Sequence, residues 1–266
     1  MPINKPFYRT YRPNNNTSAS NMYFVQHQNF ADDPLHYIRA FKHLQSDIID
    51  LFHFIEPSDI NLKTYSFKIH ELFVRTCIEI ESNFKAIMRE NNYKPIIKSE
   101  KKGPLPKKEH LWNFNDYKKI NKSHHLSSYE VLFPYWGDNQ TKIFTPFIDL
   151  ISKDSPNWYK EYHSVKHNRV KNFKNANYEN LLNAFSGLFV VLTSQFKQGN
   201  IKAGLKYLGG ISGETPLTGQ GEFHEGIGNF LLIKLPQDWG PDEYYDFNWR
   251  DLEQTGDPFQ HYDYNV

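Results

Sequence analysis

Side chains that could act as acids, bases and phosphate ligands are most concentrated in the stretch 158–169. His163 and His167 are four residues apart, and side chains at that spacing lie on one face of a helix. Imidazole titrates near neutral pH, so His167 could take or give a proton while a phosphodiester is cleaved. Lys166 and Arg169 could neutralise the charge that develops on the phosphate. The stretch predicts phosphate binding or acid–base catalysis.

The same stretch also fits a purely structural helix. Trp158, Tyr162 and Val165 share a helical face and would pack inward, which leaves the polar side chains solvated or hydrogen-bonded within the protein. A metal site is a third alternative, because histidines four apart can bind one ion. The carboxylate of a His-Glu-x-x-His motif is absent, however, and no third ligand is identifiable. We therefore expect neither a metal nor a cofactor.

A lysine-rich segment offers a second candidate surface. Its lysines could follow an RNA backbone, and Trp112, Phe114 and Tyr117 just beyond it could stack on bases. The alternative is a solvated surface loop. The lysines expected to contact RNA are Lys98, Lys101, Lys102, Lys107 and Lys108, with Lys160 from the later helix.

A ladder of alternating charges lies on an earlier predicted helix. Glu71, Arg75 and Glu79 are successive four-residue neighbours and are expected to form structural ion pairs. Alternatively, Arg75 could contact the same phosphate as His167, which requires the two helices to face each other.

The apolar spacing predicts a mainly α-helical fold. Asp33-Pro34 supplies a cap and a first-turn proline for a helix that runs to about Ile55. A second apolar stripe extends from Phe67 to about Met88, and the short link predicts an antiparallel pair. A third helix follows Ser155-Pro156 and runs to about residue 170. A fourth begins near Asn177, is apolar almost all round, and is expected to be central.

The remaining segments define the predicted domain plan. Residues 1–30 are expected to form an arm with little core, and residues 31–209 a helical domain. A basic insertion at 94–125 is expected to be mostly irregular, and a small hairpin should turn at 137–139. Residues 210–266 form a Gly-rich, acidic and irregular C-terminal extension, with one short strand at 230–233.

Composition limits the class of protein. The 266 residues are 39% hydrophobic and 16% aromatic, enough to bury a core. Cys77 is the only cysteine, which excludes an intramolecular disulfide. The longest apolar run is too short to cross a bilayer, and the N-terminus lacks the apolar core of a secretory signal. The sequence therefore predicts a cytoplasmic protein without membrane contact.

Two segments together resemble a known family. They are Leu72-Phe-Val-Arg-Thr-Cys-Ile-Glu-Ile-Glu81 on the second helix and Trp158-Tyr-Lys-Glu-Tyr-His-Ser-Val-Lys-His-Asn-Arg169 before the apolar helix. Over residues 34–197 the chain resembles HEPN-like proteins. The resemblance implies a HEPN-like helical bundle, usually dimeric, in bacterial antiviral defence or toxin-antitoxin systems. Many members are metal-independent ribonucleases, and His167 would be the motif histidine.

The chain departs from the nuclease pattern at one position. Nuclease members carry an arginine with four to six residues between it and the histidine, and no arginine here has that spacing. Lys160 stands with six residues between it and His167, but lysine is a poorer bidentate phosphate ligand. The resemblance thus predicts an RNA-binding protein that could be a metal-independent endoribonuclease. The alternative is a noncatalytic interaction subunit of a defence complex, with either function carried by a homodimer or a hetero-complex.

Overall fold

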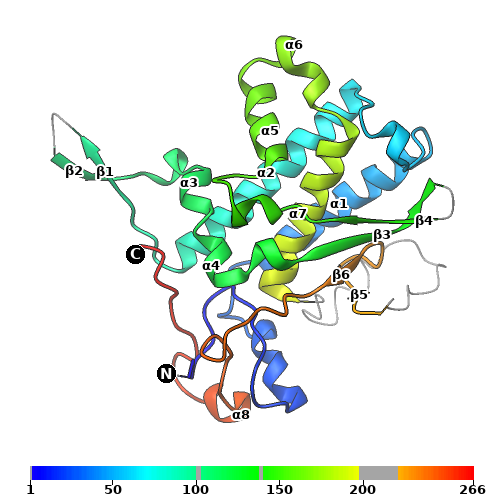
Figure 1. Ribbon diagram of the computed structural model, residues 1–266. Coiled ribbons are helices and arrows are strands. Elements are labelled where there is room, and N and C mark those ends of the chain that lie inside the picture. The colour runs from blue at the N-terminus through cyan, green and yellow to red at the C-terminus, as the bar shows by residue number, and fades with distance from the viewer. Residues whose placement is uncertain (1, 100–102, 138–139, 198–220) are drawn as a thin grey trace.

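The computed structural model describes residues 2–99, 103–137, 140–197 and 221–266, and the protein is mainly helical (Figure 1). Four long helices form the central bundle, and α7 contacts the other three. The four are α1 (Pro34–Phe52), α2 (Phe67–Glu90), α5 (Asn157–His167) and α7 (Tyr178–Phe196). None of the described helices is both long and apolar enough to cross a membrane.

The four predicted long helices are all present, with differences at their ends. Pro34 opens α1 as expected, but Asp33 has φ 37° and its side chain makes no cap hydrogen bond. Ser66 caps α2 by accepting from the backbone N–H of Ile69. The third predicted helix is interrupted at Asn168, whose side chain caps a separate short helix, α6 (Arg169–Asn172). His167 and Arg169 therefore do not share one continuous helix.

Close packing of α7 against α5 depends on a glycine. A Cβ atom at Gly187 would lie 3.3 Å from the Trp158 ring and 3.4 Å from the Phe147 ring. The neighbouring residues of α7 are buried on all sides, as expected for a central helix. Since a larger residue at 187 would push Trp158 outward, this contact fixes the position of α5 and of the side chains that it carries.

The predicted hairpin is part of a larger sheet. Strands β3 (Glu130–Trp136) and β4 (Gln140–Phe144) pair antiparallel, and β6 (Leu232–Lys234) pairs with the other edge of β3. With β5 (His224–Glu225) the sheet order is β4-β3-β6-β5. Phe133 and Phe144 pack their rings in an edge contact on it.

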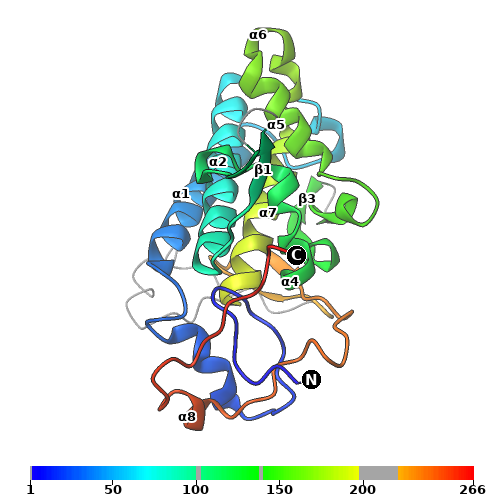
Figure 2. The ribbon, with the colours of Figure 1, turned by 90° about the vertical axis from the view of Figure 1, so that its left-hand side faces the viewer.

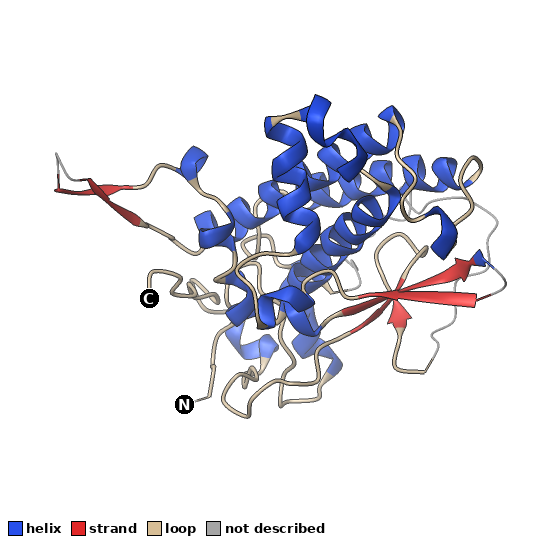
Figure 3. Ribbon diagram, turned by 45° about the horizontal axis from the view of Figure 1, so that its top comes forward, coloured by secondary structure: helices blue, strands red, loops and turns tan. Residues whose placement is uncertain are grey.

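The prediction of a mostly irregular insertion at 94–125 was wrong. β1 (Ile96–Ser99) and β2 (Gly103–Pro106) form an antiparallel ribbon that stands away from the bundle (Figure 3). Two short helices follow it, α3 (Phe114–Tyr117) and α4 (Ile120–His124). Phe114 and Tyr117 are buried beside Phe84 of α2, so the segment is attached to the core by aromatic packing.

The expectation of little core in the N-terminal arm was also wrong. The arm lies alongside the C-terminal segment, with backbone bridges from Ile3 to Tyr245 and from Phe7 to Gln260 (Figure 2). Phe24 and Phe30 are fully buried in aromatic clusters with residues of that segment. The 3₁₀ helix at Ala19–Gln26 packs against α8 (Trp249–Leu252), so the two ends of the chain build one layer across the bundle.

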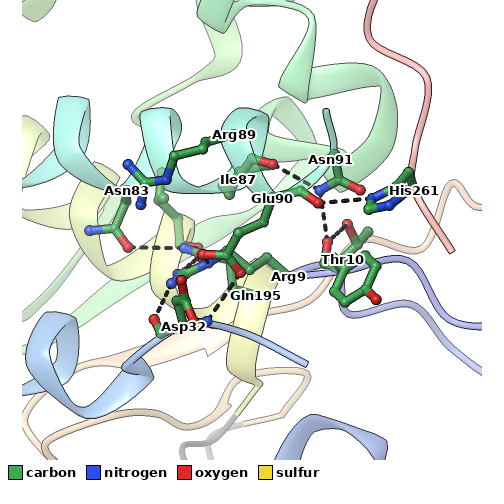
Figure 4. A network of polar contacts seen from close by, with 12 residues as sticks. Arg9, Thr10, Asp32, Asn83, Ile87, Arg89, Glu90, Asn91, Gln195 and His261 are labelled. Atoms are coloured by element: carbon green, nitrogen blue, oxygen red, sulfur yellow. Dashed lines mark hydrogen bonds and ion pairs between the residues drawn. The ribbon is translucent and has the colours of Figure 1, made fainter. Parts of the chain in front are cut away.

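Arg9 fastens this layer to the bundle (Figure 4). Its side chain is fully buried, and Nε lies 2.6 Å from Oε1 of Glu90 at the end of α2. Nη1 donates to Oε1 of Gln195 on α7, and Nη2 to the carbonyl of Asp32. The guanidinium also lies 4.7 Å from the ring centroid of Tyr37. One side chain thus joins the arm, α1, α2 and α7.

A buried imidazole joins the arm to α4 and to the C-terminal segment. Because a carbonyl can only accept, Nε2–H of His124 donates to the carbonyl oxygen of Arg9 at 2.9 Å. Its Nδ1 lies 2.7 Å from the hydroxyl oxygen of Ser123, which donates to the Ile120 carbonyl and lies 2.7 Å from the Tyr264 hydroxyl. Burial lowers the pKa of His124 to about 3. The imidazole is therefore neutral in the folded protein.

This buried histidine predicts a loss of stability in mild acid. The unfolded chain takes up a proton at His124 below about pH 6.5, whereas the folded protein takes it up only near pH 3. The free energy of unfolding should therefore decrease as the pH is lowered through this window. His124 should contribute up to about 1.4 kcal/mol of this decrease per pH unit. Urea titrations at pH 7, 6 and 5 should show a steeper decline for wild type than for His124→Gln. Equal slopes would exclude His124 as the source.

Candidate functional site

The inward face of α5 is as predicted. Trp158, Tyr162 and Val165 are buried, and the Trp158 indole donates to the carbonyl of Pro146 at 2.7 Å. Tyr159 is buried too, and its hydroxyl donates to Oε1 of Glu81 on α2 at 2.7 Å. The tyrosine next to the imidazoles therefore has a structural role, and it draws the Glu81 carboxylate toward them.

The two imidazoles of α5 are neighbours on its outer face. The rings of His163 and His167 have centroids 5.7 Å apart, and His163 lies 5.0 Å from the Tyr159 ring. His163 is half-buried, and burial lowers its pKa, with Glu81 opposing and Lys166 adding to the effect. His163 is therefore mostly neutral at pH 7, the state a proton acceptor needs.

Cations are frequent on the segments that carry and follow the imidazoles. Lys166 donates to the Tyr162 hydroxyl at 3.2 Å, while Arg169 begins α6 and is exposed. Besides Lys166, four further exposed cations of α5, α6 and the turn after it form no ion pair within the described part of the chain. They are Lys160, Arg169, Lys171 and Lys174. We call them the cationic end of the bundle.

An aromatic patch adjoins this end and was missed in the sequence. Phe67 is 71% exposed, and Tyr65 is 52% exposed. Both rings contact Phe173, with centroids 4.8 Å and 5.8 Å away. His70 also packs on Phe173, and its pKa is lowered by burial and by the charge of Arg169. The apolar stripe of α2 predicts Phe67 in the core, yet Phe67 is the first residue of the helix and lies on the surface.

The structure does not bring Arg75 to the imidazoles. Its Nη1 lies 2.7 Å from Oδ2 of Asp47 on α1 and 3.6 Å from Glu71. The side of α2 that contacts α5 carries Phe73 and Glu81 instead. Glu79, the third member of the predicted ladder, forms no ion pair with Arg75, and burial raises its pKa. Arg75 therefore links α1 to α2.

The lysine-rich segment is only partly available for binding. Lys107 lies 2.6 Å from Asp116, which also accepts from the Tyr93 hydroxyl, so Lys107 has a structural partner. Lys108 is exposed, Lys98 belongs to β1, and Lys101 and Lys102 lie outside the described residues. Of the aromatic residues expected to stack on bases, Phe114 and Tyr117 are buried, and Trp112 is partly buried against the core.

In the described ranges, no three His, Cys, Asp or Glu side chains are grouped so as to hold a metal ion. Comparisons of the chain with family models, with curated proteins and with solved structures found no match.

Proposed function

We propose that the protein binds RNA at the cationic end of the bundle and cleaves it without a metal ion. The observation that carries this proposal is the pair of imidazoles 5.7 Å apart on α5, of which His163 has a lowered pKa. The unpaired cations beside them supply the positive potential that a phosphate backbone requires. Both features belong to one surface.

In this proposal His163 is the base and His167 the acid. Neutral His163 takes the proton of a ribose 2′-hydroxyl, and the oxygen attacks the adjacent phosphorus. The bond from phosphorus to the 5′-oxygen breaks, and that oxygen takes a proton from His167. The products are a 2′,3′-cyclic phosphate and a 5′-hydroxyl. Lys166 and Arg169 stabilise the additional negative charge on the phosphate oxygens.

The HEPN-like resemblance supplies a setting for this chemistry. A bundle of four helices, with the motif histidine at the end of α5 and an apolar α7 at its centre, is compatible with such a fold. We extend the proposal accordingly to a HEPN-like protein of a bacterial antiviral or toxin-antitoxin system that acts as a dimer or hetero-complex.

The direct test is to incubate the purified protein with a mixed, end-labelled RNA pool in EDTA. The expected result is cleavage that leaves 2′,3′-cyclic phosphate ends, identified by their resistance to phosphatase until acid opens the ring. Intact RNA, or cleavage that depends on added Mg²⁺, would contradict the proposal.

The aromatic patch should contribute to RNA affinity. Stacking of one base on an aromatic ring contributes about 1–3 kcal/mol, so Phe67→Ala should weaken binding of single-stranded RNA roughly tenfold. Because Phe67 is mostly exposed, the substitution should leave the free energy of unfolding nearly unchanged. Fluorescence anisotropy with a labelled oligonucleotide measures the affinity. Phe54→Ala is the matched control, since Phe54 is 85% exposed and has no ring partner among the described aromatic residues. Equal RNA affinities of the two variants would exclude the aromatic patch from RNA binding.

The β1–β2 ribbon favours the second candidate function, a noncatalytic interaction subunit. Ile96 is 67% exposed on it, and Ile97 and Leu105 are also exposed. An apolar ribbon that stands away from the bundle suits pairing with another protein. A folded protein that leaves RNA intact, and that loses its partner on Ile96→Asp, would favour this function over the nuclease.

A further inference from the structure

A cavity of about 550 Å³ lies on the side of α5 away from the imidazoles. Its walls are the first turns of α5, the segment 145–149, the turn before α7, the first turns of α7 and Lys63. Asn157, Trp158 and Glu161 line it from α5, whereas His163 and His167 do not. It is thus separate from the proposed cleavage site.

Amide side chains dominate the lining, and three of them have a fixed orientation. The Nδ2 atom of Asn175 donates to Glu161 Oε2 at 2.6 Å, that of Asn180 to the carbonyl of Asn175 at 2.8 Å, and that of Asn183 to the carbonyl of Glu179 at 3.0 Å. All three acceptors are oxygens that cannot donate, so the nitrogen and oxygen of each amide are identified. The three Oδ1 atoms have no hydrogen-bond partner in the described part of the protein. These oxygens can therefore accept hydrogen bonds from a ligand or from water.

The charged groups of the lining are mainly acidic. Lys63 is the one cation among the lining residues, and it is already paired with Glu179. Asp149 is paired with Lys153 at 2.8 Å. Glu161 accepts from Asn175 and from Ser164, yet no cation lies within ion-pair distance of it among the described residues. The cavity therefore holds a carboxylate without a cationic partner.

Apolar surface completes the cavity. Pro146, Ile148 and Trp158 form part of its wall. This combination of carbonyl oxygens, an unpaired carboxylate and apolar wall repels phosphates and nucleotides. It matches a ligand that carries ammonium groups, each with three N–H donors and no acceptor, on a methylene chain.

We propose that this cavity binds a linear aliphatic polyamine. One ammonium group pairs with Glu161, and another is held by the amide oxygens of Asn180 and Asn183. The methylenes between them lie along Pro146 and Ile148. The volume accommodates such a chain together with bridging water molecules.

The test is isothermal titration calorimetry, in which the whole chain is titrated with spermidine and, separately, with MgCl₂. Spermidine should bind with one-to-one stoichiometry and shift the Trp158 indole N–H resonance in NMR spectra. Glu161→Gln removes a charge-assisted hydrogen bond and should weaken binding about tenfold or more. Asn183→Leu should weaken it by a smaller factor. Glu71→Gln is the matched control, because Glu71 is an exposed carboxylate on α2 outside the cavity.

Three results would overturn the proposal. They are no binding of spermidine at millimolar concentration, displacement of spermidine by Mg²⁺ at an equal concentration of charge, and equal affinity of wild type and both cavity variants. Circular dichroism checks that the variants are folded, and the Trp158 resonance tests the site in wild type without any substitution.

Discussion

His163→Ala and His167→Ala should each slow RNA cleavage roughly 10²- to 10⁴-fold, the usual contribution of a positioned acid or base. Their affinity for RNA should change little, because the exposed lysines and Arg169 remain in place. The double variant should be only slightly slower than either single variant, since the two groups act together in one cleavage step. Single-turnover kinetics with a labelled oligonucleotide in EDTA separate the cleavage rate from binding.

His53→Ala is the matched control, because His53 is an exposed imidazole at the end of α1. The dependence of the rate on pH gives a second readout. Burial lowers the pKa of His163 below 6.5, the usual value for histidine. The wild-type cleavage rate should therefore decrease only when the pH falls below 6.5, and this decrease at low pH should be absent from His163→Ala. Full cleavage by both folded alanine variants would remove these residues from the mechanism.

Arg9→Met should destabilise the folded protein severely. It leaves the Glu90 carboxylate, Oε1 of Gln195 and the Asp32 carbonyl without their shared donor. Loss of one member of a buried ion pair costs about 3–5 kcal/mol, which is a large part of the stability of most proteins. Urea unfolding followed by tryptophan fluorescence measures the loss.

An exposed ion pair provides the comparison. Lys63→Met breaks the ion pair between Lys63 and Glu179, and both of these side chains are solvent-accessible. It should lower the free energy of unfolding by less than about 1 kcal/mol. Arg9→Met combined with Glu90→Leu should recover part of the loss, because no buried charge is then left unpaired. If Arg9→Met cost no more than Lys63→Met, the buried network would have no special role in stability.

The long helices could be predicted because their signals are local. Apolar spacing along α1, α2 and α7 reports burial directly, and Pro34 marks a helix start whatever surrounds it. The arm could not be predicted in this way. Arg9 is buried because its partners come from three distant segments, and nothing in residues 1–30 reports them. The β1–β2 ribbon was missed because its strands are short and carry two prolines and a lysine.

In the candidate site too, the sequence predicted the features that depend on local spacing and missed those that depend on distant segments. Helical spacing correctly placed His163 and His167 as neighbours, because four residues make about one turn. Spacing could not show that Tyr159 is buried, which depends on Glu81 of α2 and on the Phe114 ring 4.6 Å away. The cavity was equally hidden, since its asparagines meet only when the turn before α7 folds back on α5.

The interlaced ends of the chain impose an order on folding during synthesis. Phe7 donates its backbone N–H to the hydroxyl of Tyr245, 238 residues further along. At 5–20 residues per second a ribosome needs roughly 10–50 s to make that interval, far longer than helices need to form. Arg9 lacks Gln195 until α7 has been made, and Phe24 lacks the Tyr245 ring until still later. The arm is thus the first segment made and among the last to reach its final contacts, since these come from α7 and from the C-terminal segment.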